Sequence, residues 1–107
     1  MNLTKTIFVK IVTVGSRVFV TSFQVAGVQG KVVDSPEKAY DEIKQLTSDP
    51  SVGLILVSDD MSNPITDKLT SLRTAKSTPL VFSLPSQGGK KSIDYEMMLK
   101  KILLEYN

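Results

Sequence analysis

The sequence predicts an α/β protein with one four-stranded parallel sheet flanked by helices, and two observations carry this prediction. Short runs rich in β-branched residues alternate along the chain with amphipathic segments of helical period, a pattern typical of parallel sheets with helices on their faces. One of these runs, Gly53–Val57, has no polar side chain. A short apolar run of this kind predicts a strand that is buried on both faces.

The first strand and the first helix come from the opening third of the chain. Ile7–Val14 is rich in Ile and Val and is followed by Gly15, so it predicts a strand. In the next segment, Ser16–Gly27, the residues Val18–Val20 favour a strand by propensity. A helix is the better prediction because three apolar residues share one helical face: Phe19, Phe23 and Ala26.

The second strand and the second helix have clearer boundaries. Lys31–Val33 predicts a short strand. Ser35 and Pro36 then predict a helix start, with serine as the N-cap and proline in the first turn. The helix should end before Pro50. Its apolar stripe consists of Ala39, Tyr40, Ile43 and Leu46.

The remaining sheet residues follow the same alternation. Val52–Val57 predicts the central strand, and Leu80–Leu84 predicts the fourth. Between them, Asn63 and Pro64 predict the start of a helix. Its apolar face consists of Ile65, Leu69 and Leu72. Right-handed crossovers are expected between these parallel strands.

The end of the chain predicts a separate unit. We expect an α/β domain over residues 1–85, followed over 86–107 by a glycine-containing flexible loop and a C-terminal helix, Ser92–Tyr106. Nine of the fourteen side chains over residues 93–106 are apolar or aromatic, more than one stripe requires. If one face packs on the sheet, Ile93, Met97 and Leu104 remain exposed. Both a partner-binding helix and ordinary core with scattered exposed residues fit this pattern.

Composition excludes several classes of protein. The chain has 107 residues, 41% of them hydrophobic, a net charge of +2, and neither cysteine nor histidine. Disulfides, thiolate metal sites and cysteine or histidine catalysis are therefore excluded. The small net charge argues against nucleic-acid binding. No apolar run reaches the length of a membrane span, and no signal-peptide pattern is present, so a cytoplasmic location is expected.

Asp59 and Asp60 follow the central strand, where parallel-sheet proteins often hold an active site. A receiver-like phosphoacceptor and Mg²⁺ site would need further acidic residues after the first strand, but Gly15 and Ser16 stand there. Such a site would also need a lysine after a fifth strand, which the sequence does not predict. The simpler interpretation is that Asp59 or Asp60 caps the helix that follows.

The segment Gly88–Ser92 resembles a phosphate-binding loop only superficially. The required serine or threonine does not follow the first lysine directly, because Lys91 stands there, and Leu84 holds the position of the first glycine. A hinge before the last helix is the better interpretation. The sequence therefore predicts no catalytic residue, no metal site and no cofactor.

An ordered set of segments resembles the F subunit of the archaeal and bacterial A-type/V-type ATPases, over nearly the whole chain from Ile7. No single segment is diagnostic. The segments are the first strand ending at Gly15, Ser22–Gly27, Ser35–Ala39, Gly53–Val57, Pro79–Val81 and Leu84–Gly88.

The resemblance implies a Rossmann-like (receiver-like) fold and a non-catalytic rotor subunit of the central stalk. Such a subunit binds the coiled-coil D subunit within the head of A and B subunits, and couples ATP synthesis or hydrolysis to proton or sodium transport, with a regulatory role. It reaches the cell membrane only peripherally, through the complex. The expected partner-binding residues are Val32 and Val33 at the sheet edge, with Ile93, Met97, Met98, Ile102 and Leu104 on the last helix.

Two other functions stay open at this point. A degenerate receiver-like signalling module would dock on a protein partner, and phosphorylation at Asp59 or Asp60 would reveal it. A small enzyme would have to rely on Asp, Ser or Lys alone, and the sequence offers no base near a nucleophile.

Overall fold

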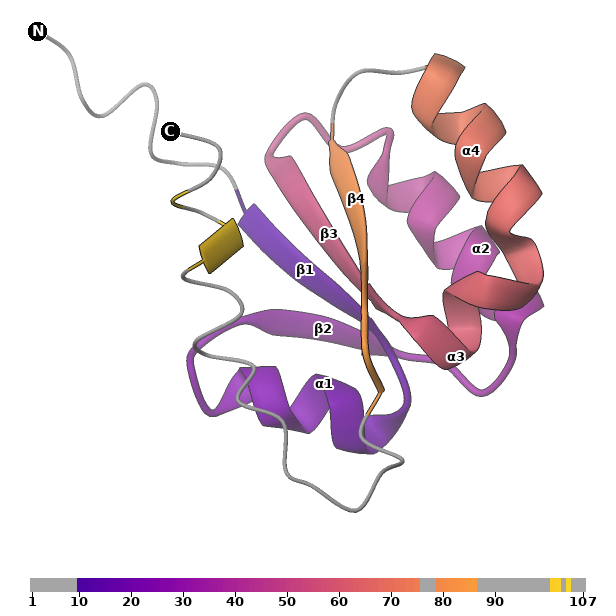
Figure 1. The fold of residues 1–107 in the computed structure, drawn as a ribbon. Coiled ribbons are helices and arrows are strands. Elements are labelled where there is room, and N and C mark those ends of the chain that lie inside the picture. Colours follow the sequence, from indigo (N-terminus) through magenta and orange to yellow (C-terminus); the bar gives the residue numbers. More distant parts are fainter. Residues whose placement is uncertain (1–9, 76–78, 87–100, 103, 105–107) are drawn as a thin grey trace, which may run out of the picture.

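The computed structural model describes residues 10–75, 79–86, 101, 102 and 104, and these contain one sheet of four parallel strands. The strands are β1 (Lys10–Gly15), β2 (Gln29–Val32), β3 (Val52–Ser58) and β4 (Leu80–Leu84). Their order is β2-β1-β3-β4, so β1 and β3 lie at the centre and β2 and β4 form the edges (Figure 1). The predicted fold class is confirmed.

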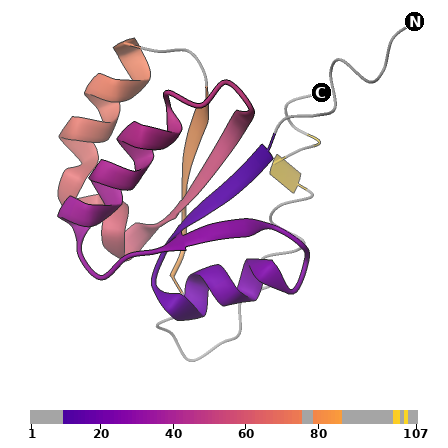
Figure 2. The ribbon, with the colours of Figure 1, turned by 180° about the vertical axis from the view of Figure 1, so that it is seen from behind.

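Helices cover the two faces of the sheet unequally (Figures 1 and 2). The helices are α1 (Arg17–Gln24), α2 (Pro36–Leu46), α3 (Asp59–Ser62) and α4 (Thr66–Ala75), with a 3₁₀ turn, η2 (Asn63–Ile65), between the last two. We call the face under α2, α3 and α4 the α2 face, and the opposite face, under α1, the α1 face.

The α2 face holds the larger apolar cluster. Helix α2 begins as the sequence predicts: Ser35 Oγ accepts a hydrogen bond from the Lys38 N–H at 3.2 Å, and Pro36 lies in the first turn. Tyr40 and Leu72 pack against the rim of the cluster. Its buried members are Val12, Val14, Val33, Ala39, Ile43, Leu46, Val52, Ile55, Val57, Met61, Ile65, Leu69 and Val81.

The α1 face holds a smaller cluster, in which the rings of Phe19 and Phe23 lie 5.3 Å apart between centroids. The other buried members are Val20, Val28, Leu54, Leu56 and Leu84. The half-buried Ile11, Leu80, Phe82 and Ile102 pack around them. Helix α1 contacts mainly β1 and β2, so the β3–β4 half of this face has less helical cover from the described residues.

Two glycines define the position of α1. Gly27 has a φ of +85°, and around it the Gly27 N–H donates to the Gln24 carbonyl and the Val28 N–H to the Phe23 carbonyl. This is the Schellman arrangement that ends a helix. On β2, a Cβ at Gly30 would collide with Thr13 Oγ1 and with a methyl of Val20. Helix α1 therefore packs directly on the backbone of β2.

Several sequence predictions need correction in detail. Ala26 is exposed rather than buried, because α1 ends at Gln24 and Ala26 lies in the turn that leads to the left-handed Gly27. The helix predicted from Asn63 corresponds to η2 and α4, so its α-helical part begins later, at Thr66, and a separate short helix, α3, precedes it because the chain turns into a helix directly after β3. Pro64 lies inside the 3₁₀ turn instead of starting the helix. Residues 7–9 and most of the predicted last helix lie outside the described residues.

Candidate functional site

The carboxyl edge of the sheet, where a receiver-like site would lie, is packed rather than open. A Cβ on Gly15 would lie 2.7 Å from both the Phe19 ring and Ser58 Oγ. Ser58 is fully buried, and its hydroxyl has no hydrogen-bond partner among the described groups. Nearby, the hydroxyls of Ser62 and Ser83 are hydrogen-bonded to each other. The hydroxyls of Ser58 and Ser62 therefore lie in close packing at this edge.

The two carboxylates at this edge belong to the start of α3. Asp59 and Asp60 lie in the first turn of α3. A negative charge at this position interacts favourably with the positive end of the helix dipole. The N-cap position itself belongs to Ser58, so the prediction that an aspartate caps this helix is wrong in that detail. Asp59 Oδ1 instead accepts a hydrogen bond from the Ser86 N–H at 2.9 Å. Asp59 thereby ties the chain leaving β4 to the start of α3.

The described residues contain no group of three or more acidic, histidine or cysteine side chains placed to hold a metal ion. They also contain no helix with the length and apolar character needed to cross a membrane.

The two predicted sheet-edge residues point in opposite directions. The Val32 side chain is 48% exposed, whereas Val33 is buried in the cluster on the α2 face. Strand geometry explains the contrast, because successive side chains point to opposite faces of a sheet. Of this pair, Val32 is the residue with a side chain accessible to a partner.

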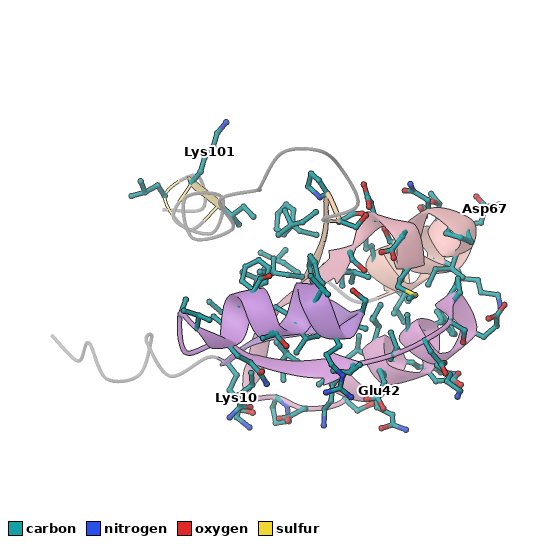
Figure 3. All side chains as sticks on the ribbon, turned by 90° about the horizontal axis from the view of Figure 1, so that it is seen from below. Lys10, Glu42, Asp67 and Lys101 are labelled. Carbon is teal, nitrogen blue, oxygen red and sulfur yellow. The ribbon has the colours of Figure 1, made fainter. Side chains whose placement is uncertain are left out.

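The described residues of the C-terminal segment also separate into two environments. Ile102 is half-buried and packs against the cluster on the α1 face, while Leu104 is 74% exposed. Figure 3 shows Lys101 on the same side of the sheet as α1. The other candidates on this segment, Ile93, Met97 and Met98, lie outside the described residues.

Helix α1 presents two further apolar side chains that the sequence interpretation did not select. Val18 is 58% exposed, and Val25, at the helix C-cap, is 88% exposed. They are seven residues apart, so they lie on one side of the helix, away from the buried Phe19 and Phe23. The i, i+7 spacing of the two valines predicts that they share a side of the helix, but the spacing alone does not say whether that side is exposed.

Comparison with known proteins gives a family. Residues 11–102 match the model of the family described as ATP synthase (F/14-kDa) subunit. The chain is similar to the F subunit of the A-type ATP synthase of Thermoplasma volcanium, at 28% identity over 87% of this chain and 89% of the relative. It is 25% identical, over the same shares, to the protein of the same name from Thermoplasma acidophilum. The chain therefore belongs to the ATP synthase (F/14-kDa) subunit family, whose members are non-catalytic subunits of a rotary ATPase.

Proposed function

We propose that the chain is the central-stalk rotor subunit, which binds the coiled-coil D subunit and turns with it inside the head of A and B subunits. In this role it couples ATP synthesis or hydrolysis to proton or sodium transport and can regulate the motor. It is cytoplasmic and reaches the membrane only through the complex. Family membership supports this role, and the signalling alternative is not favoured because the matched relatives are ATP synthase subunits.

The observation that carries the proposal is a set of three exposed valines, two on α1 and one on the edge strand β2. Val18, Val25 and Val32 lie on α1 and β2, two elements that pack together, with Val25 at the C-cap of α1. We call them the valine surface. Val32 is paired in register with Gly15, directly before the start of α1, so Val32 and Val18 lie at the same end of the molecule.

The chemistry of the valine surface fits a coiled coil. Three valines leave water when they are covered, and each buried methylene contributes about 0.8 kcal/mol of favourable transfer free energy. Exposed valines on a helix and on the edge strand beside it offer rigid apolar contacts, because valine has few side-chain rotamers to lose. A coiled coil buries its a and d side chains between its own helices, so the D subunit would meet the three valines with apolar side chains that lie outside that seam.

We propose that residues 86–107 form the second contact, with the A and B subunits. Ile102 holds one side of this segment against the α1 face, which leaves Leu104 directed away from it. Ile93, Met97 and Met98 are the further candidates on the same predicted helix. Asp59 supports the start of the segment through its hydrogen bond to Ser86.

Co-expression with the D subunit of the same organism tests the first contact. We expect the wild-type chain to co-purify with the D subunit, and Val18→Glu combined with Val32→Glu to abolish the complex. The matched control is Thr70→Glu combined with Ala75→Glu, which places the same charges on exposed positions of α4. Absence of a wild-type complex, or equal loss in the control, would overturn the proposed contact.

Site-directed cross-linking tests the second contact. The natural sequence has no cysteine, so Leu104→Cys places a single thiol for a maleimide-linked photoreactive group. In the assembled ATPase we expect cross-links from this position to A or B, and none from the control Lys68→Cys on α4. Cross-links from both positions alike, or from neither, would contradict a contact made by the C-terminal segment.

A further inference from the structure

A hollow of about 360 Å³ opens at the amino ends of β1 and β3, beside the edge strand β2. Its floor is apolar and consists of the buried side chains of Val12, Leu46 and Val52. Polar and charged residues surround this floor: Lys10, Gln24, Gln29, Lys31 and Asp49, with Gly30 between them. An apolar floor inside a polar rim is typical of a site that takes an amphipathic group.

The side chains of the two rim lysines form no close ion pair within the described residues. Among the described residues, the ion pair that occurs is Lys38 with Asp34, 3.3 Å apart on the exposed side of α2, so neither Lys10 nor Lys31 is paired. Figure 3 shows Lys10 extending from the sheet on the side away from α1. Within the described residues, the charge of Lys10 acts weakly on Asp49 and that of Lys31 has no partner, so both ammonium groups can still bind an anion.

The one carboxylate of the rim is already engaged. Asp49 Oδ1 accepts hydrogen bonds from the Ser51 N–H at 2.9 Å and from the Ser51 hydroxyl at 2.6 Å. These bonds, and to a lesser degree the charge of Lys10, lower the pKa of Asp49 below its ordinary value, so the group remains ionised at neutral pH. Two ammonium groups and one carboxylate leave the lining with an excess of one positive charge.

We propose that this hollow receives a glutamate or aspartate side chain from a segment of a partner protein. The carboxylate lies between Lys10 and Lys31, its aliphatic stem covers Val12, Leu46 and Val52, and the amides of Gln24 and Gln29 donate further hydrogen bonds. The positive rim selects the charge, and the apolar floor selects a side chain with a hydrocarbon stem over a bare inorganic anion. Val32 points to the opposite face of β2 from Lys31, so this site is distinct from the valine surface.

The test uses the isolated 107-residue chain, so its result does not depend on whether the D subunit binds. A blocked hexapeptide of alternating leucine and glutamate is titrated into the ¹⁵N-labelled chain, with a leucine–glutamine hexapeptide as the uncharged control. We expect the glutamate peptide to shift the amide signals of Lys10, Gly30 and Lys31 and to bind more tightly than the glutamine peptide. Equal affinity of the two peptides, or shifts confined to other surfaces, would overturn the proposal.

Two double variants test whether the positive charges that bind the peptide are those of the hollow. Lys10→Gln combined with Lys31→Gln should weaken binding of the glutamate peptide about fivefold, the size expected when two exposed ion pairs are lost. Lys38→Gln combined with Lys68→Gln removes the same charge from α2 and α4 and should leave the affinity unchanged. The unfolding midpoints of both variants are measured alongside. Equal weakening in the two double variants would show a general charge effect and would also overturn the proposal.

Discussion

The two faces of the sheet differ in how completely helices cover their apolar residues. On the α2 face, three helices and a 3₁₀ turn enclose a cluster whose thirteen principal members are all buried. On the α1 face, one eight-residue helix covers a cluster of seven buried residues, and four of the surrounding apolar side chains are only half-buried. The first face is complete within the described residues, and the second shares its cover with Ile102 of the C-terminal segment.

We expect the difference in cover to separate the residues that stabilise the fold from those proposed to bind a partner. A closed, densely packed face tolerates little change, because a cavity in it cannot be filled by its neighbours. A face covered by one short helix, with half-buried side chains around it, opens locally at a smaller cost in free energy than a closed face. The exposed Val18, Val25 and Val32 all belong to the α1 side. Substitutions on the two faces should therefore have different consequences.

The largest loss in the free energy of unfolding is expected from a substitution in the core of the α2 face. Ile43 is fully buried there, so Ile43→Ala should lower the free energy of unfolding by about 3 kcal/mol through lost burial and a residual cavity. Urea unfolding followed by circular dichroism measures this. Leu72→Ala, at the half-buried rim of the same cluster, is the control and should cost clearly less. Equal costs would mean that the α2 face is not closed as described.

Substitution at the contact between α1 and β2 should give the next largest loss in the free energy of unfolding. Gly30→Ala places a methyl against Val20 and Thr13, and overpacking of this kind costs about 2 kcal/mol. Adding Val20→Ala removes the collision with Val20, although that with Thr13 remains, so the double variant should lose less free energy of unfolding than the sum of the two single variants. A double-mutant cycle in urea measures the coupling, and strict additivity would contradict the direct packing of α1 on β2.

A smaller effect is expected at the end of α1. Gly27→Ala forces alanine into a left-handed conformation, at a cost of about 1 kcal/mol, with no collision because nothing lies within 4 Å of the new Cβ. Gly27→Asn should cost less, since asparagine adopts this conformation more readily. Thermal unfolding of the two variants compares them. A larger loss with Asn than with Ala would argue against a purely conformational cause.

The contribution of the C-terminal segment should be smaller still. Ile102 is half-buried on the α1 face, so Ile102→Ala should cost the isolated chain below about 1 kcal/mol, well under the cost of a fully buried isoleucine. Comparison with Ile43→Ala under identical urea conditions sharpens the contrast between the faces. A cost as large as that of Ile43→Ala would mean that the segment is an integral part of the core.

The smallest effect concerns the turn between α2 and β3. Hydrogen bonds from the Ser51 hydroxyl and N–H lower the pKa of Asp49, so its carboxylate stabilises the folded chain above the ordinary aspartate pKa. This contribution should fade as the pH falls through the lowered pKa, below about pH 4. The carboxyl carbon shift of Asp49 across an NMR titration measures the pKa. An ordinary or raised value would contradict the geometry, and Ser51→Ala should bring the pKa back toward normal.

The sequence predicted the sheet and its helices well because their signals are local. The unbroken apolar run Gly53–Val57 identified the central strand, and Ser35 with Pro36 identified the start of α2. The helix over Val18–Val20 was predicted correctly against β propensity, because Phe19 and Phe23 share one face. Element ends were less accurate at Ala26 and Asp59, where a left-handed glycine and a direct strand-to-helix turn decide the boundary.

The candidate site was harder to predict because exposure depends on tertiary packing. Val32 and Val33 look alike in sequence, yet β2 directs one to solvent and the other into the core. Val18 and Val25 could be recognised as exposed only once the buried side of α1 was known. The hollow beside β2 combines residues from β1, α1, β2, α2 and β3 with Asp49 from the turn between α2 and β3, and no spacing in the sequence brings these together. The contacts of Ile93, Met97 and Met98 stay predictions.

Hydrogen–deuterium exchange of the chain, alone and in the assembled ATPase, tests the division between the two faces most directly. If the valine surface binds the stalk, peptides covering α1 and β2 should gain protection on assembly, while peptides covering α2 and α4 should exchange at nearly the same rate in both states. Added protection confined to α2 and α4, with α1 and β2 unchanged, would contradict the assignment of the α1 side as the partner-binding side of the protein.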